Sequence, residues 1–137
     1  NVPFAVVESD LERVRRLVAG GIAATWGDAG RHEVLDRLHV PTARAVVIAV
    51  PDESTALVAT AAARDRNASV PILVRARSGG EIGAFHLLGA NEVVVPAFEG
   101  GLELMRQALI AIGNDPEEAL HLSHAMRDIH YQAAGHD

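Results

Sequence analysis

The sequence predicts an α/β fold, a mostly parallel sheet with helices on both faces. Short apolar runs alternate with helical patterns along the whole chain, which is the order that strand-helix-strand crossovers produce. The run 45–50 is continuously apolar, as expected of a strand buried on both faces. Hydrophobic residues make up 49% of the 137 residues, enough to form the core of a single domain of ordinary size.

The apolar runs predict five strands. They are expected at Phe4–Glu8, Ile22–Trp26, Ala45–Val50, Ile72–Arg75 and Glu92–Val95. Each is followed by a helical pattern, so consecutive strands are expected to run parallel and their carboxyl ends to meet at one edge.

Capping signals and apolar spacing predict the helices. Ser9 and Glu12 have the spacing of a capping box that opens the first helix, and Gly20 and Gly21 end it. Asp115 has the position of an N-cap for the last helix, which is expected to run to about residue 134. The helices between them are predicted at 33–38, 53–66, 82–88 and 101–112.

Composition and charge exclude several classes of function. The formal charge of -6 has the wrong sign for attraction to nucleic acid or to anionic lipid. The chain has no cysteine, and all its basic residues are arginine, which excludes thiol chemistry, Schiff bases and a P-loop lysine. No stretch approaches the roughly 18–20 apolar residues of a membrane span.

Ligands of open parallel sheets bind beyond the carboxyl ends of the strands, so the residues that follow each strand are the candidates for a site. Glu8 ends the first strand, where a carboxylate can accept hydrogen bonds from both hydroxyls of a ribose. Alternatively, it only adds charge at the start of the next helix. Asp28 lies in the turn Gly27–Gly30 and is either a ligand residue or an ordinary turn residue.

The later strands offer further candidates. Asp52 is expected to cap the helix that follows the third strand. Arg75 and Arg77 follow the fourth strand and are suited to a phosphate or carboxylate, or else to surface ion pairs. The segment 99–101 is either an anion site on free amides or a flexible cap.

Five motifs in order resemble one family. They are Val6-Val7-Glu8, Trp26-Gly27-Asp28-Ala29, the run Ala45–Asp52, the run Ile72–Arg77 and the run Gly89–Pro96. Together they are similar to the TrkA-N (RCK) domain. Phe98-Glu99-Gly100-Gly101-Leu102 and the helices after it resemble the version found in Kef-type potassium/proton antiporters.

The resemblance implies a Rossmann-like, doubly wound domain over residues 1–113, with a helical extension over 114–137. It implies a cytoplasmic homodimer that binds NAD(H) or AMP, performs no chemistry on it, and gates a membrane-embedded cation transporter on the same or a separate chain. In that family Glu8 would hold the ribose, and Asp28 and Ala29 would border the adenine. The pocket floor would be Ala49, Val50 and Pro51, and Arg75 and Arg77 would face the phosphates or an acidic effector such as glutathione.

One element of that family is not found in the sequence. The family opens with a strand and a Gly-x-Gly-x-x-Gly turn whose helix holds the phosphates. In the strand order 3-2-1-4-5-6 this strand is central and lies between the first and third strands predicted here. We expect that an upstream segment supplies it; alternatively, a partner chain donates it, or the two halves close up in another strand order.

Two other functions are compatible with the fold, and the last helix raises a separate possibility. An NAD-dependent oxidoreductase would need a proton donor near the nicotinamide, and the chain has one tyrosine, in the tail, and no lysine. A dimerisation scaffold would bind no nucleotide. In the last helix, His121 and His124 lie on a face with two carboxylates, but solvated histidines are the expectation there and no metal site is predicted.

Overall fold

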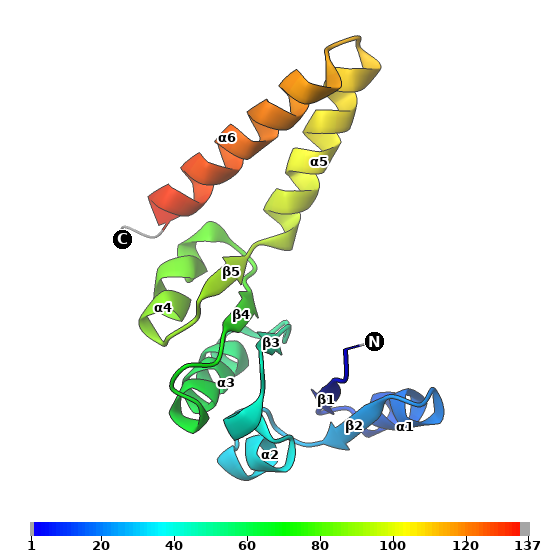
Figure 1. The fold of residues 1–137 in the computed structure, drawn as a ribbon, viewed down its shortest axis with the longest axis vertical. Helices are drawn as coiled ribbons and strands as arrows, with labels where there is room; N and C mark the ends of the chain where they lie inside the picture. Colours follow the sequence, from blue (N-terminus) through cyan, green and yellow to red (C-terminus); the bar gives the residue numbers. More distant parts are fainter. Residues whose placement is uncertain (1, 135–137) are drawn as a thin grey trace.

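The computed structural model describes residues 2–134 and contains two parallel sheets. One sheet pairs β1 with β2, and the other has the order β3-β4-β5. The elements are β1 Ala5–Glu8, α1 Leu11–Ala19, β2 Ala23–Trp26, α2 His32–Arg37, β3 Val46–Ile48, α3 Glu53–Arg66, β4 Ile72–Arg75, α4 Ile82–Leu87, β5 Glu92–Val94, α5 Pro96–Ala111 and α6 Pro116–Ala134. The α/β class and the five parallel strands are therefore confirmed (Figure 1).

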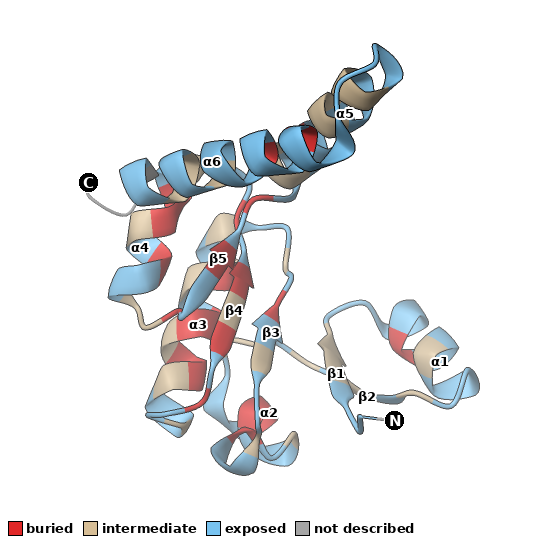
Figure 2. Ribbon diagram, turned by 45° about the horizontal axis from the view of Figure 1, so that its top comes forward, coloured by how far each residue is buried: buried red, intermediate tan, exposed pale blue. Residues whose placement is uncertain are grey.

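The two sheets do not join. Each has an open edge, because β1 pairs with β2 alone and β3 pairs with β4 alone among the described residues. Figure 2 shows β1, α1 and β2 as a lobe set apart from the rest of the molecule. The alternative in which the two halves close up in another strand order is therefore wrong for this part of the chain.

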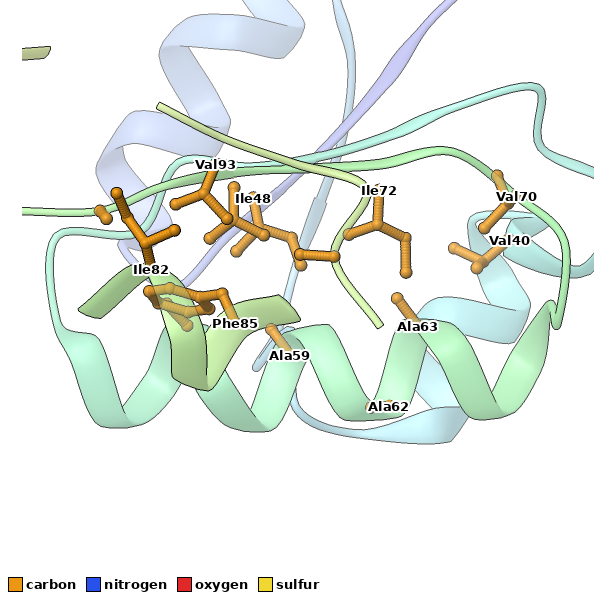
Figure 3. Packing of buried hydrophobic residues seen from close by; sticks show 14 of the residues in the cluster. Val40, Ile48, Ala59, Ala62, Ala63, Val70, Ile72, Ile82, Phe85 and Val93 are labelled. Carbon is orange, nitrogen blue, oxygen red and sulfur yellow. The ribbon is translucent and has the colours of Figure 1, made fainter. Parts of the chain in front are cut away.

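The core lies under the sheet of three strands. Ile48, Ile72 and Val74 are buried on its inner face, against α3 and α4 (Figure 3). The inner side of α3 is lined with buried alanines, whose small side chains let the helix approach the strands closely. Phe85 of α4 is fully buried in the same cluster. On the opposite face of β3, Val47 is 71% exposed.

Two predicted helix starts are wrong. The first helix is capped by Asp10 instead of Ser9, since the Asp10 carboxylate accepts the N–H groups of Glu12 and Arg13. A carboxylate at this position also interacts favourably with the helix dipole. The fifth helix begins at Pro96 instead of residue 101, because a proline at the first helical position is preorganised for a helix.

Several other signals predicted the structure correctly. Gly20 and Gly21 end α1, and Gly21 has a φ of 79°, which glycine adopts without steric cost. Asp52 caps α3 through the N–H of Thr55. Asp115 accepts two N–H groups at the start of α6, which ends at the last described residue. Of the expected extension over 114–137, residues 135–137 lie outside the described residues.

Candidate functional site: the carboxyl edge of the strands

The Glu8 carboxylate is held in place at the end of β1. Its Oε1 accepts the N–H of Asp10 at 2.9 Å, and its Oε2 lies 3.5 Å from Nη1 of Arg13. The Asp10 N–H, followed by the charge of Arg13, holds the pKa of Glu8 below its ordinary value despite an opposing effect of burial. The side chain remains 23% exposed. A carboxylate has about four acceptor positions, so this one is ionised, oriented and able to accept further hydrogen bonds.

The loop after β2 lies beside Glu8. Trp26 is the register partner of Glu8, and the N–H of Gly27 donates to the Glu8 carbonyl at 3.1 Å. The Trp26 indole donates to the carbonyl of Ser9 at 3.0 Å and is 59% exposed. Asp28 accepts the N–H of Gly30 at 2.8 Å. Glu8 and the turn that contains Asp28 therefore form one continuous edge, as the topology predicted.

Ala29 and the segment after β3 contact the same core. Ala29 and Val50 are half-buried against the main hydrophobic cluster, whereas Ala49 and Pro51 are exposed. Small and apolar side chains thus follow β3 directly, before Asp52 begins α3. This segment offers van der Waals contact to a ligand and no charge of its own.

The two arginines after β4 have different surroundings. Arg77 donates to Glu81 at 3.2 Å and to Glu53 at 3.4 Å, and Glu81 also accepts the Arg77 backbone N–H. Arg75 is exposed at the end of β4 and has no polar partner within residues 2–134. Arg75 is therefore the guanidinium that is free to receive an anion, while Arg77 is already neutralised by carboxylates.

The segment 99–101 is not an anion site. These residues lie inside α5. Their amide groups are therefore not free in the way that those of a loop or a helix cap would be. Glu99 instead receives the Arg127 guanidinium of α6, which donates to both carboxylate oxygens over 2.8–3.2 Å. Arg127 holds the pKa of Glu99 below its ordinary value.

The end of α6 is attached to the carboxyl edge by further contacts. The Tyr131 hydroxyl accepts the N–H of Val95 at 3.1 Å, and burial raises the pKa of this tyrosine. The His130 ring stacks on Phe98 with 3.7 Å between ring centroids. A hollow of about 620 Å³ between β5 and α6 includes Glu99, Arg127 and Tyr131 in its lining and lies away from Glu8.

Residues 2–134 contain no group of three or more His, Asp or Glu side chains arranged to hold a metal ion, although His121 and His124 share a helix with several carboxylates. No helix within the same range is long and apolar enough to cross a membrane.

The structure thus brings the predicted residues together in two groups. Glu8, Asp28 and Ala29 lie on the edge formed by β1 and β2, and the other predicted residues lie on the edge of the three-stranded sheet: Ala49, Val50, Pro51, Arg75 and Arg77. Arg13 was not predicted as a site residue, and its position five residues after Glu8 on the next helix is the available signal. The pairing of Glu99 with Arg127, which lies 28 residues away, was not predicted either.

Parallel strands, crossover helices and a polar edge at the strand ends define this chain as a Rossmann-like α/β domain. The family model of the TrkA-N domain matches residues 1–96. The chain belongs to the TrkA-N domain family.

The relatives of the chain are transport proteins. It is 28% identical over 116 residues to the putative cation/proton antiporter YbaL of Escherichia coli strain K12, covering 85% of this chain and 20% of YbaL. It is 26% identical over 131 residues to the glutathione-regulated potassium-efflux system protein KefC of Escherichia coli O157:H7, covering 96% of this chain and 21% of KefC. The chain therefore spans about a fifth of the length of these relatives.

Solved structures share the fold. The TrkA-N domain of YbaL from Escherichia coli has a TM-score of 0.71 and 26% identity, covering 82% of this chain and 80% of that one. The Shewanella denitrificans Kef C-terminal domain in its AMP-bound form has a TM-score of 0.77 at 18% identity, covering 96% and 94%. The GsuK channel bound to NAD has a TM-score of 0.64 at 23% identity, covering 76% and 18%.

Proposed function

We propose that this chain is the nucleotide-sensing regulatory domain of a potassium/proton antiporter or related cation transport system. AMP or NAD(H) binds across the carboxyl ends of the strands and is not chemically changed. The Glu8 carboxylate carries the proposal, because it is ionised, oriented by Asp10 and still partly exposed at the position where a ribose is recognised. The AMP and NAD bound by the Kef and GsuK structures support the choice of an adenine nucleotide.

The roles of the other residues follow from their positions. Asp28 and Ala29 border the adenine, and Ala49, Val50 and Pro51 form the apolar floor. Arg75 pairs with a phosphate, since its guanidinium has no other polar partner among residues 2–134. Arg77 contributes less, because Glu53 and Glu81 already neutralise it.

The proposal includes a strand between β1 and β3. Each of these strands has an edge without a partner in the described residues, and unpaired buried backbone groups are destabilising. We place there a parallel strand from a segment that precedes β1, which would join the two sheets and bring both groups of site residues to one crevice. Donation of this strand by a second chain is the other outcome that a test must distinguish.

Regulation follows from binding across two lobes. The β1–β2 sheet and the β3–β5 sheet carry different parts of the site, so a bound nucleotide stabilises one relative arrangement of the two. In a homodimer at the cytoplasmic face of the membrane, that arrangement biases the attached transporter.

Thermal denaturation with and without nucleotide tests the binding. The natural polypeptide in full is expected to gain about 2.7 kcal/mol of stability at a nucleotide concentration one hundred times the Kd. Glu8→Ala should abolish this gain. Glu12→Ala is the matched control, since Glu12 is an exposed carboxylate on α1 that forms its ion pair with Arg15, and it should retain the gain. A melting temperature that no adenine nucleotide changes would contradict the proposal and favour a dimerisation scaffold.

Transport assays test the regulatory role separately from binding. Vesicles that contain the natural polypeptide should show nucleotide-dependent potassium efflux, and Glu8→Ala should remove the dependence on nucleotide without removing the basal flux. Size-exclusion chromatography with light scattering gives the oligomeric state. A monomer would contradict the proposed homodimer; it would also exclude a swapped strand and leave the same chain as the source of the strand between β1 and β3.

A further inference from the structure

The His130 ring of α6 contacts both α5 and the loop that follows β4. It stacks on Phe98 of α5, with 3.7 Å between the ring centroids and 15° between the ring planes. It also lies so close to Gly79 that a Cβ added there would be 3.1 Å from its Cε1 and 3.3 Å from its Nε2. The C-terminal end of α6 therefore rests against the loop 76–81 through this imidazole.

The Nε2 atom of His130 has an environment that suits the neutral ring and not the charged one. Among residues 2–134 it is the one buried side-chain nitrogen or oxygen without a hydrogen-bond partner. A neutral imidazole that carries its proton on Nδ1 has no donor at Nε2 and needs no acceptor there. An imidazolium has a donor on both nitrogens. Protonation therefore places an N–H at Nε2 without an acceptor, and an unsatisfied buried donor is most destabilising when it is charged.

The neighbouring ionisable groups do not supply the missing acceptor. The elements packed against this end of α6 are α5, α4 and the loop after β4. Their ionisable side chains, and those beside His130 on α6, already have partners of their own: Glu99 with Arg127, Glu53 and Glu81 with Arg77, His86 with the Ala90 carbonyl, and Tyr131 with the Val95 N–H. Two other carboxylates, Glu92 and Asp128, line the hollow between β5 and α6, and His130 does not.

Two weaker effects favour a positive charge on the ring. Glu99 attracts a charged His130, and this attraction is the smallest of the effects that lower the pKa of Glu99, after the hydrogen bond from Arg127 and the others. A cation also interacts favourably with an aromatic face such as that of Phe98. Neither effect gives Nε2 a hydrogen-bond acceptor, so both leave the cost of the buried donor in place.

We infer that protonation of His130 releases the C-terminal end of α6 from the loop 76–81, which makes this contact sensitive to protons near neutral pH. Histidine is the side chain whose ordinary titration falls in this range. In the released arrangement both ring nitrogens reach water, so acid shifts the equilibrium toward release. The loop begins directly after Arg75, so protons act on a segment next to the proposed nucleotide site. The inference goes beyond the proposed function and needs no nucleotide.

Deuterium exchange of the Val95 amide in the natural polypeptide in full, without nucleotide, tests the inference. This N–H donates to the Tyr131 hydroxyl at 3.1 Å, so its protection reports whether the end of α6 is docked. The protection factor is corrected for the intrinsic effect of pH on exchange. It is expected to fall by about tenfold between pH 8 and pH 5.5, because an ordinary histidine is about ten times more often charged than neutral at pH 5.5. The protection of amides in α3 should stay constant.

Substitutions at two histidines of α6 assign the effect. His130→Phe keeps a ring against Phe98 and cannot be protonated, so it should remove the fall in protection. His130→Gln should also remove the fall, with lower protection at every pH because the stacked ring is lost. His124→Gln is the matched control, since His124 is exposed on the same helix, and it should keep the fall.

Two results would overturn the inference. One is a protection factor of the Val95 amide in the unmodified protein that is constant, or that rises, as the pH falls from 8 to 5.5. The other is a fall that persists in both His130 variants, which would assign the proton to another group such as His86. The pair of Glu99 and Arg127 does not compete as an explanation, because the pKa of Glu99 is lowered from 4.5 and so lies below the range of the measurement. The test is made without nucleotide, so neither result bears on the proposed function.

Discussion

The ion pair between Glu99 and Arg127 is expected to stabilise the docking of α6 by about 1 kcal/mol. Arg127 donates three hydrogen bonds of 2.8–3.2 Å to the carboxylate, and hydrogen bonds to charged groups contribute about 1.5–3 kcal/mol. The side chains are 28% and 37% exposed, so solvent screening reduces this value toward the ~0.2–1 kcal/mol of exposed pairs. Removing the pair should lower the Tm by about 3–4 °C for a domain of this size.

A double-mutant cycle measures this interaction directly. Glu99→Gln, Arg127→Gln and the double variant are compared by chemical denaturation at pH 7, and the coupling energy is taken from the cycle. The control cycle uses Glu103 and Arg106, which form an ion pair of 2.7 Å. Both residues belong to α5, so this pair does not connect α5 to another element. A coupling of zero for Glu99 and Arg127, or one no larger than that of the control, would refute the reasoning.

The same pair should depend on pH with a definite sign. Arg127 lowers the pKa of Glu99 from its ordinary value of 4.5, so the folded state binds this proton less tightly than the unfolded state does. The stabilisation is therefore complete above about pH 4.5 and is lost as the pH falls through the lowered pKa. The difference in unfolding free energy between the natural chain and Glu99→Gln should be constant from pH 7 to pH 5.5 and should shrink below pH 4.5. A difference that grows on acidification would contradict this sign.

Three further substitutions test the packing of the fold. Phe85→Ala should cost about 3–5 kcal/mol in denaturant unfolding, because the ring is fully buried; a cost below 1 kcal/mol would show that the core cluster is wrongly assigned. Tyr131→Phe removes the acceptor of the Val95 N–H, so exchange of that amide with deuterium should become faster while the exchange of amides in α3 stays unchanged. Gly27→Ala would place a Cβ 3.0 Å from a methyl group of buried Val34 and should cost about 1–3 kcal/mol; adding Val34→Ala should reduce the further loss below the sum of the two single effects.

Local sequence patterns predicted most of the fold, because interactions between residues close in the sequence determine where the strands and helices form. The apolar run before Arg75 and the cap at Asp52 each act within a few residues, and both elements begin and end where predicted or within a residue. The errors arose where two signals competed. Ser9 and Asp10 both have N-cap side chains, and the backbone selects Asp10 because its carboxylate reaches two amides. Pro96 starts α5 before the glycines that suggested a later beginning.

The site was less predictable than the fold, because the three-dimensional fold determines which carboxylate pairs with which arginine. Arg75 and Arg77 are equivalent in a sequence pattern, being two apart at the end of one strand. The fold distinguishes them, since Glu53 at the start of α3 and Glu81 after the loop both reach Arg77. Arg75 remains without a polar partner in the described part of the chain. A sequence pattern therefore identifies candidate residues for an anion site, but it does not show which of these residues is already paired with a carboxylate.

The carboxyl edge also connects the proposed nucleotide site to the last helix. His130 of α6 lies so close to the loop after β4 that a Cβ on Gly79 would meet its ring at 3.1 Å. That loop follows Arg75 and Arg77. The neighbouring strand β5 is followed directly by Val95, whose N–H donates to the hydroxyl of Tyr131 of the same helix. A side chain at position 79 would require the His130 ring to shift by a few tenths of an ångström. A displacement of the loop toward α6 must therefore move His130. The loop that would respond to a nucleotide phosphate is thus the same loop that contacts α6.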